Sequence, residues 1–175
     1  AAIGGDHSCQ LLPHLDFELI RANPKIFMGY SDITVLNIAF HVATGLVTFN
    51  GPALVPEFAE YPEMLEYGRA SFERTVVKGG RIGSIEPAAE WTEEILDWER
   101  KLDLTRPRAM NPADGWVPVR EGVAEGPLIG GCIESLQHLR GTPYWPQFDG
   151  AIVFLETSED APPPATVDGL LADYE

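Results

Sequence analysis

The pattern that most restricts the fold is a strand, a helix and a second strand within residues 25–50. The run KIFMG at 25–29 is short and apolar, as in a buried strand, and LVTFN at 46–50 is a second such run. Between them, ITVLNIAFHVATG has helical spacing and ends in Gly45, a typical C-terminal cap. This order indicates a βαβ unit, and hence an α/β fold with a parallel sheet.

Charge and composition narrow the class of protein. The chain has 12 basic and 27 acidic residues, a net charge of −15, which repels nucleic acid and anionic membranes. It has no apolar run of membrane-spanning length and no basic leader. Two cysteines suggest buried thiols in a reducing compartment rather than a disulfide framework. A cytoplasmic globular protein without nucleic-acid or membrane partners is predicted.

The chain divides into three parts by composition. Residues 1–80 carry the βαβ pattern and are predicted to be part of an N-terminal α/β domain. Residues 81–116 mix a short acidic helix with proline-rich irregular chain and hold three of the four tryptophans, as expected of an insertion or lid. Residues 117–175 are predicted to begin a second, mixed α/β domain, with GAIVFLE at 150–156 as a buried strand.

Ser31 lies where the first strand ends and the helix begins. One interpretation is a helix cap, because Ser31 and Asp32 are residue types that satisfy unpaired N–H groups there. The other is a nucleophile on a strand-to-helix elbow, with the Asp32 N–H and the helix N-terminus facing a developing oxyanion. The local sequence fits both.

Four longer segments resemble one family. They are GGDHSCQLLPHLDF, NPKIFMGYSDITVL, TFNGP and GPLIGGCIESLQHLRGTPYWPQFDGAIVFLE, in this order along the chain. Together they are similar to the LD-carboxypeptidase family of serine peptidases, which includes the microcin C self-immunity peptidases. The resemblance implies an N-terminal domain bearing the nucleophile on an elbow and a C-terminal domain bearing the rest of a triad in the order Ser, Glu, His.

Carried over to this sequence, the resemblance assigns the nucleophile to Ser31 and the triad carboxylate to Glu156. A carboxylate at the tip of an apolar strand is well held for orienting an imidazole. The alternative is a solvated carboxylate that opens an acidic loop. The same resemblance puts the Gly4-Gly5 turn beside the nucleophile, so Gly5 and the Asp32 amide form the candidate oxyanion pair. A plain tight turn is the alternative.

The general base is missing from this pattern. In the family the histidine follows the glutamate, but the four histidines here precede Glu156; they are His7, His14, His41 and His138. His7 is the nearest substitute, and His41 and His138 fit structural roles. The first residue is not methionine, and we interpret the sequence as a fragment that lacks the triad histidine and is inactive alone.

The resemblance leaves two substrates open. The family removes C-terminal groups such as D-alanine from murein tetrapeptides, and its microcin branch cleaves an amide linking aspartate to an adenylate. Trp91 and Trp98 are seven residues apart, so a helix would place them on one face, either stacking on a nucleobase or anchoring the helix. Arg106 and Arg108 either meet an anionic group or balance local charge.

The remaining expectations concern partners and other classes. No metal or cofactor is expected, since the acidic residues and histidines lack ligand spacing. The resemblance implies a homodimer. A non-catalytic module that binds a nucleotide or peptide conjugate is the alternative function. An α/β-hydrolase esterase is disfavoured, because Ile33 stands where the second glycine of GxSxG would be.

Overall fold

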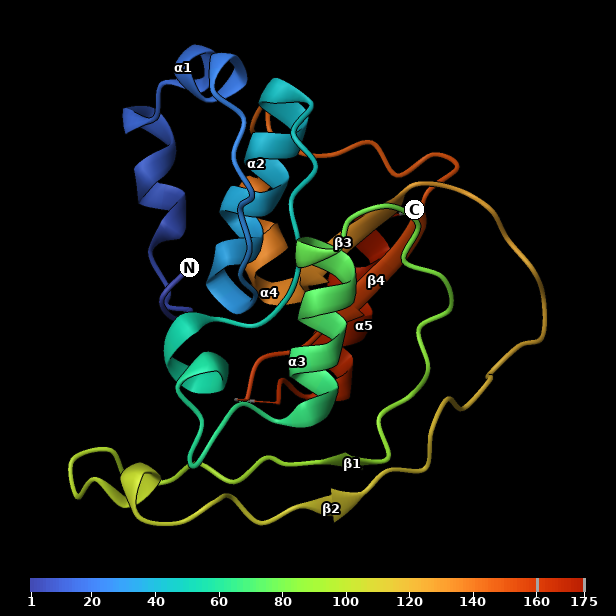
Figure 1. Cartoon of the computed structure of the whole chain (residues 1–175). Helices are drawn as coiled ribbons and strands as arrows, with labels where there is room; N and C mark the ends of the chain where they lie inside the picture. The colour runs from blue at the N-terminus through green and yellow to red at the C-terminus, as the bar shows by residue number, and fades with distance from the viewer. Residues whose placement is uncertain (160, 175) are drawn as a thin grey trace. The chain divides into compact units, whose positions relative to one another are not determined.

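The computed structural model describes residues 1–159 and 161–174, which form two compact units. The first unit joins Ala1–Ala53 to Ala124–Glu175, and the second is Leu54–Val123. Figure 1 shows the elements of each unit along the chain. The first unit is thus assembled from the two ends of the sequence, with the second as one continuous segment between them. The predicted domain boundaries at residues 80 and 116 stay a prediction.

The first unit is a mixed α/β arrangement. Its helices are α1, α2, α4 and α5, at Phe17–Ala22, Thr34–Thr44, Ile133–Leu136 and Pro164–Leu171. Its strands are β3 at Leu128–Cys132 and β4 at Ile152–Glu156. Short 3₁₀ helices lie at Ser8–His14, Ser31–Ile33, Gln137–Leu139 and Ala172–Tyr174.

Helix α2 is the centre of this unit. Seven consecutive residues from its first turn onward, Thr34 to Phe40, are buried, and a helix buried on all sides belongs in a core. It packs with apolar side chains from the 3₁₀ helix at Ser8–His14, from β3 and from α4. Gly45 ends the helix at φ 77°, a left-handed cap conformation that suits glycine. The predicted helix is therefore confirmed.

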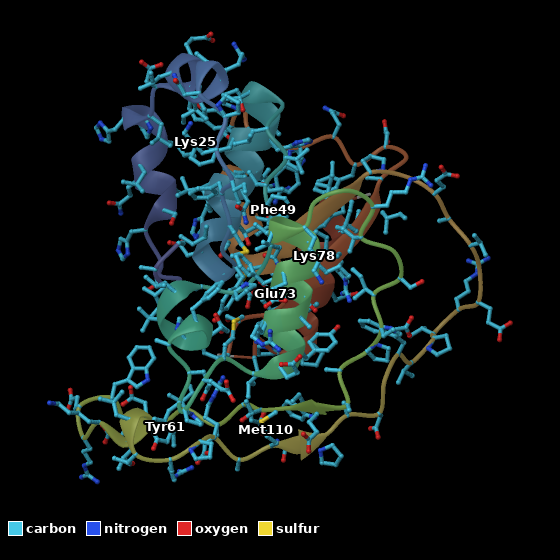
Figure 2. All side chains as sticks on the ribbon, in the orientation of Figure 1. Lys25, Phe49, Tyr61, Glu73, Lys78 and Met110 are labelled. Atoms are coloured by element: carbon cyan, nitrogen blue, oxygen red, sulfur yellow. The ribbon has the colours of Figure 1, made fainter. Side chains whose placement is uncertain are left out.

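The two predicted strands that flank α2 meet only at one parallel bridge, between Met28 and Phe49. Phe49, labelled in Figure 2, donates to the Phe27 carbonyl at 3.0 Å and accepts from Gly29 at 3.1 Å. The parallel direction agrees with the βαβ pattern, but full strands do not form. A parallel sheet requires both of its faces to be buried. Ile26 and Val47 are 63% and 68% exposed, so the described residues do not cover both faces of these two runs.

Strands β3 and β4 form a parallel pair in which Gly130 is opposite Phe154. A Cβ added to Gly130 would lie 1.7 Å from the Phe154 carbonyl oxygen. That contact is with backbone, so a side chain there cannot be accommodated by a rotamer change. The glycine permits the close approach of the two strands.

We therefore expect Gly130→Ala to lower the free energy of unfolding by at least about 3 kcal/mol, the upper range for overpacking. Denaturant unfolding followed by circular dichroism measures this loss. Gly122→Ala is the matched control, because no atom lies within 4 Å of its added Cβ. An equal effect of the two substitutions would contradict the role of strand spacing.

The second unit has little interior. It contains α3 at Glu66–Phe72, helical turns at Leu54–Phe58, Glu73–Val77 and Leu102–Leu104, and the antiparallel two-residue strands β1 at Glu90–Trp91 and β2 at Asn111–Pro112. Glu73 and Lys78 lie on the helical segment of this unit in Figure 2. Leu96 is the one buried residue in this fully described segment.

The predicted helix that would align Trp91 and Trp98 is wrong. Trp91 is in β1, paired with Asn111 of β2, and its indole N–H donates to the Pro112 carbonyl at 3.2 Å. Residues 92–97 have no helical structure. A helix this short gains too few hydrogen bonds to offset its nucleation, and here the backbone finds strand partners instead.

Candidate active site

Ser31 is held in an uncommon backbone conformation at the start of α2. It follows the Met28 bridge closely, opens the 3₁₀ turn Ser31–Ile33, and has φ 57°. The left-handed region is costly for a residue with a Cβ, and non-glycine residues found there often belong to functional sites. The Ser31 N–H is not used as a helix donor. Its acceptor is the Glu156 carboxylate.

Glu156 is the last residue of β4, and its Oε1 accepts a hydrogen bond from the Ser31 N–H at 3.3 Å. The Asn50 side chain also hydrogen-bonds this carboxylate. Burial raises the pKa of Glu156, and the nearby Glu134 charge adds to the rise, while the bonds from Ser31 and Asn50 oppose it. The structure thus brings together the two residues assigned to nucleophile and triad carboxylate, although 125 positions separate them.

A second contact fixes the β3–β4 pair against the start of α2. The Cys132 N–H at the end of β3 donates to Oγ1 of the fully buried Thr34 at 3.0 Å. A Cβ on Gly131 would lie 2.5 Å from the Thr34 side chain. Sheet and helix therefore meet without a gap three residues beyond Ser31, which leaves little room for Glu156 to move relative to Ser31.

Glu134 holds the chain just after Glu156. Its Oε1 accepts from the Ser158 N–H at 3.0 Å and from the Ser158 hydroxyl at 2.8 Å, and the Cys132 thiol contacts its Oε2 at 3.4 Å. Burial opposes ionisation of Glu134, but the hydrogen bonds from Ser158, from its own backbone N–H and from the Cys132 thiol together lower the pKa of Glu134. Glu134 is thus a charged anchor for the loop that follows β4.

The glycine turn lies against Ser31. A Cβ built on Gly4 would meet the Ser31 Cβ at 3.0 Å and its hydroxyl oxygen at 3.1 Å. The Ser31 and Ile33 N–H groups have acceptors, Glu156 and the Tyr30 carbonyl. Within the described residues, neither the Asp32 nor the Gly5 N–H has an acceptor. The two candidate oxyanion donors are both available near the serine hydroxyl.

The histidines do not complete a triad. His41 Nδ1 contacts the Leu46 carbonyl at 3.2 Å, a structural contact at the end of α2. His7 approaches through its backbone, since its N–H donates to the Asp32 carboxylate at 3.0 Å. In the part of the chain that the structure describes, no histidine ring hydrogen-bonds to the Ser31 hydroxyl.

The residues predicted for substrate contact lie in the second unit. Trp91 and Trp98 are about half exposed, at 46% and 49%. Arg106 forms an ion pair with Glu94 at 2.6 Å, and Arg108 forms one with Glu60. Both arginines thus bind carboxylates of their own chain, in agreement with the charge-balancing interpretation.

Four contributions were not predicted from the sequence. They are the side chains of Asn50, Glu134 and Ser8 and the carboxylate of Asp32, whose Oδ2 accepts three hydrogen bonds. All four residues stand inside the segments that carried the family resemblance, which was the available signal. Among the described residues there is no group of three or more potential metal ligands, and no helix long and apolar enough to cross a membrane.

Comparison with known families matches both ends of the chain. Residues 1–51 match the model of the LD-carboxypeptidase N-terminal domain, and residues 125–175 match that of the LD-carboxypeptidase C-terminal domain. These ranges nearly coincide with the two segments of the first unit. The site described above therefore lies within the matched residues.

Individual proteins give the same picture. The chain is 37% identical over 160 residues to the microcin C7 self-immunity protein MccF of Escherichia coli, covering 90% of this chain and 46% of that protein. It is 34% identical over 161 residues to a probable murein peptide carboxypeptidase of Bacillus subtilis, covering 92% and 42%. The structure of MccF in complex with aspartyl sulfamoyl adenosine matches with a TM-score of 0.79 and 34% identity, covering 98% and 51%. The chain spans about half the length of these relatives.

Proposed function

The chain belongs to the LD-carboxypeptidase family, and we propose that it provides the nucleophile and the triad carboxylate of a serine peptidase that hydrolyses a C-terminal amide bond. One observation carries the proposal. Ser31, in a left-handed conformation, and Glu156, far away in sequence, meet through a hydrogen bond of 3.3 Å. A purely capping serine would need neither the conformation nor the carboxylate.

In the proposed reaction, the Ser31 hydroxyl oxygen attacks the amide carbon while a histidine takes its proton. The carbon–nitrogen bond then breaks, the amine leaves with that proton, and water hydrolyses the acyl-serine. Glu156 orients the histidine and stabilises its charge, and the N–H groups of Gly5 and Asp32 bind the oxyanion. The histidine is expected outside these 175 residues, so this stretch alone is proposed to be inactive.

For the substrate, we propose a peptide-nucleotide conjugate over a murein peptide. One support is the 37% identity to MccF, which is named as a microcin C7 self-immunity protein. The other is the similar structure of MccF in complex with aspartyl sulfamoyl adenosine. Trp91 and Trp98, with nearly half their surface exposed, are the proposed stacking groups for a base. The similarity to a probable murein peptide carboxypeptidase keeps the LD-tetrapeptide as the competing substrate. A cytoplasmic homodimer is part of the same proposal.

The test compares the two substrates directly. The protein expressed from its complete gene is given an LD-tetrapeptide and an aspartyl-adenylate amide in parallel, and kcat/KM is measured for each. We expect turnover of the aspartyl-adenylate amide, with kcat/KM at least about tenfold above that of the tetrapeptide, which corresponds to about 1.4 kcal/mol of transition-state binding. The reverse preference would reject the substrate assignment, and no turnover of either would reject the peptidase.

A binding module is the second candidate. It is favoured by the lack of a histidine ring on the Ser31 hydroxyl within residues 1–159 and 161–174. A binder retains either ligand unchanged, so calorimetric binding without product, in the same protein and with the same two compounds, would support it.

A further inference from the structure

The Asp32 carboxylate is buried beside the candidate site, with only 4% of the residue exposed. Its Oδ2 accepts hydrogen bonds from the His7 N–H at 3.0 Å, the Ser8 N–H at 2.9 Å and the Ser8 hydroxyl at 2.7 Å. Its Oδ1 is also buried and has no partner among the described residues. One carboxylate oxygen therefore accepts three hydrogen bonds, and the donors belong to residues 24 and 25 positions earlier in the chain.

This carboxylate replaces a local helix cap. The 3₁₀ helix Ser8–His14 begins without a capping bond from the side chain of His7, the residue that precedes it. Asp32 accepts instead from the N–H groups of His7 and of Ser8, the first helical residue. Charge-assisted bonds of this kind are stronger than neutral ones. The start of the helix, and the glycine turn just before it, are thereby tied to residue 32.

These hydrogen bonds affect the position of both candidate oxyanion donors. One candidate donor is the backbone N–H of Asp32 itself, and the other is the N–H of Gly5, which is part of the tied turn. A Cβ added to Gly5 would lie 3.4 Å from Asp32 Oδ2, so the carboxylate lies beside Gly5. The distance between the two donors is thus set by the side chain of the residue that supplies one of them.

We propose that the Asp32 carboxylate is a positioning residue that fixes the spacing between the Gly5 and Asp32 N–H groups beside Ser31. The proposal rests on the proposed serine peptidase function. It predicts that loss of the carboxylate lowers kcat more than it changes KM, because an oxyanion hole binds the transition state more strongly than the substrate.

The test uses Asp32→Ala, Asp32→Asn and Asp16→Ala in the protein expressed from its complete gene, with the better of the two amide substrates. Asp16 is the matched control, since it also accepts a backbone N–H, that of Leu19 at 2.8 Å, but on the exposed helix α1. We expect Asp32→Ala to lower kcat about 100-fold with KM changed less than about threefold, as for a misplaced catalytic group. Asp32→Asn keeps a carbonyl acceptor for the three donors, so it should lose less than about tenfold. Asp16→Ala should leave kcat unchanged.

Hydrogen exchange at the His7 and Ser8 amides is the second readout, and it does not depend on turnover. Protection of these amides should fall in Asp32→Ala and persist in Asp32→Asn. If Asp32→Ala does not fold, Ser8→Ala removes one of the three bonds and should lower kcat about threefold with KM unchanged.

The outcomes separate the inference from the function on which it rests. If Ser31→Ala is inactive but Asp32→Ala has normal kcat, or if KM alone changes, the positioning role is overturned and the peptidase stands. If Ser31→Ala keeps full turnover, or the unmodified protein has none, the peptidase assignment is overturned and the positioning role with it. A drop in kcat that Asp32→Asn largely restores, together with lost amide protection in Asp32→Ala, supports the proposal.

Discussion

Ser31→Ala is expected to lower kcat by about 10⁶-fold in the protein expressed from its complete gene, the loss found when other serine peptidases lose their nucleophile. The substitution removes only the hydroxyl oxygen. It leaves the Ser31 N–H bond to Glu156 in place, so KM should change little. Steady-state kinetics on the aspartyl-adenylate amide measures both values. Ser84→Ala, at an exposed serine of the second unit, is the control and should have normal kcat.

Ser31→Gly separates the nucleophile from a structural cap. Because Ser31 has φ 57°, glycine relieves strain there, and the free energy of unfolding should rise by about 1 kcal/mol. Activity should be as low as for Ser31→Ala. A residue selected as a cap would instead lose stability when replaced by alanine. If both substitutions destabilise the fold and leave kcat unchanged, Ser31 is a structural residue.

Local pattern was sufficient to predict the elements around Ser31. The helical spacing of residues 33–45 and the glycine at its end predicted α2 with its left-handed cap. The apolar run ending at Glu156 predicted the strand β4. The prediction that this strand is buried is wrong, because Ile152 and Val153 are exposed and residues 154–156 are only partly buried. Each of these signals depends on neighbours within a few residues, which is the range over which periodicity carries information.

Contacts between distant segments could not be predicted in the same way. The Asp32 carboxylate fits the pattern of a helix cap, yet its partners are His7 and Ser8 rather than the helix that it precedes. The Trp91–Trp98 spacing fits a helix, but β2 supplies a strand partner for Trp91. In both cases the outcome depends on a segment roughly 20 residues away, and local sequence does not specify which segment that is.

Glu156→Gln is expected to lower kcat by about 10⁴-fold, the loss found when the triad carboxylate of a serine peptidase becomes an amide. Only the ionised carboxylate stabilises the imidazolium that forms when Ser31 is activated. The acid limb of the kcat profile reports the histidine that takes the Ser31 proton together with Glu156. Since burial raises the pKa of Glu156, the contribution of this carboxyl to the limb should lie above the usual glutamate value near 4.5. Glu134→Gln removes the neighbouring charge that adds to this rise and should move the limb to lower pH. An acid limb at the usual value in both proteins would contradict the assignment.

The same substitution should make the fold more stable at neutral pH. A glutamate whose pKa is raised on folding favours the folded state while it is protonated, below pH 4.5, and that contribution is lost as the pH rises through the raised value. At pH 7 the ionised, half-buried carboxylate therefore destabilises the fold. The glutamine variant has no such charge, and its side-chain carbonyl can still accept the Ser31 N–H. Denaturant unfolding should give Glu156→Gln a higher free energy of unfolding than the unmodified protein at pH 7 and an equal one at pH 4. The control Glu121→Gln should leave the free energy of unfolding unchanged at both pH values. If Glu156→Gln is less stable at pH 7, the charge of Glu156 stabilises the fold. The expected gain in stability would instead show that ionised Glu156 is retained for catalysis although its buried surroundings disfavour the charge.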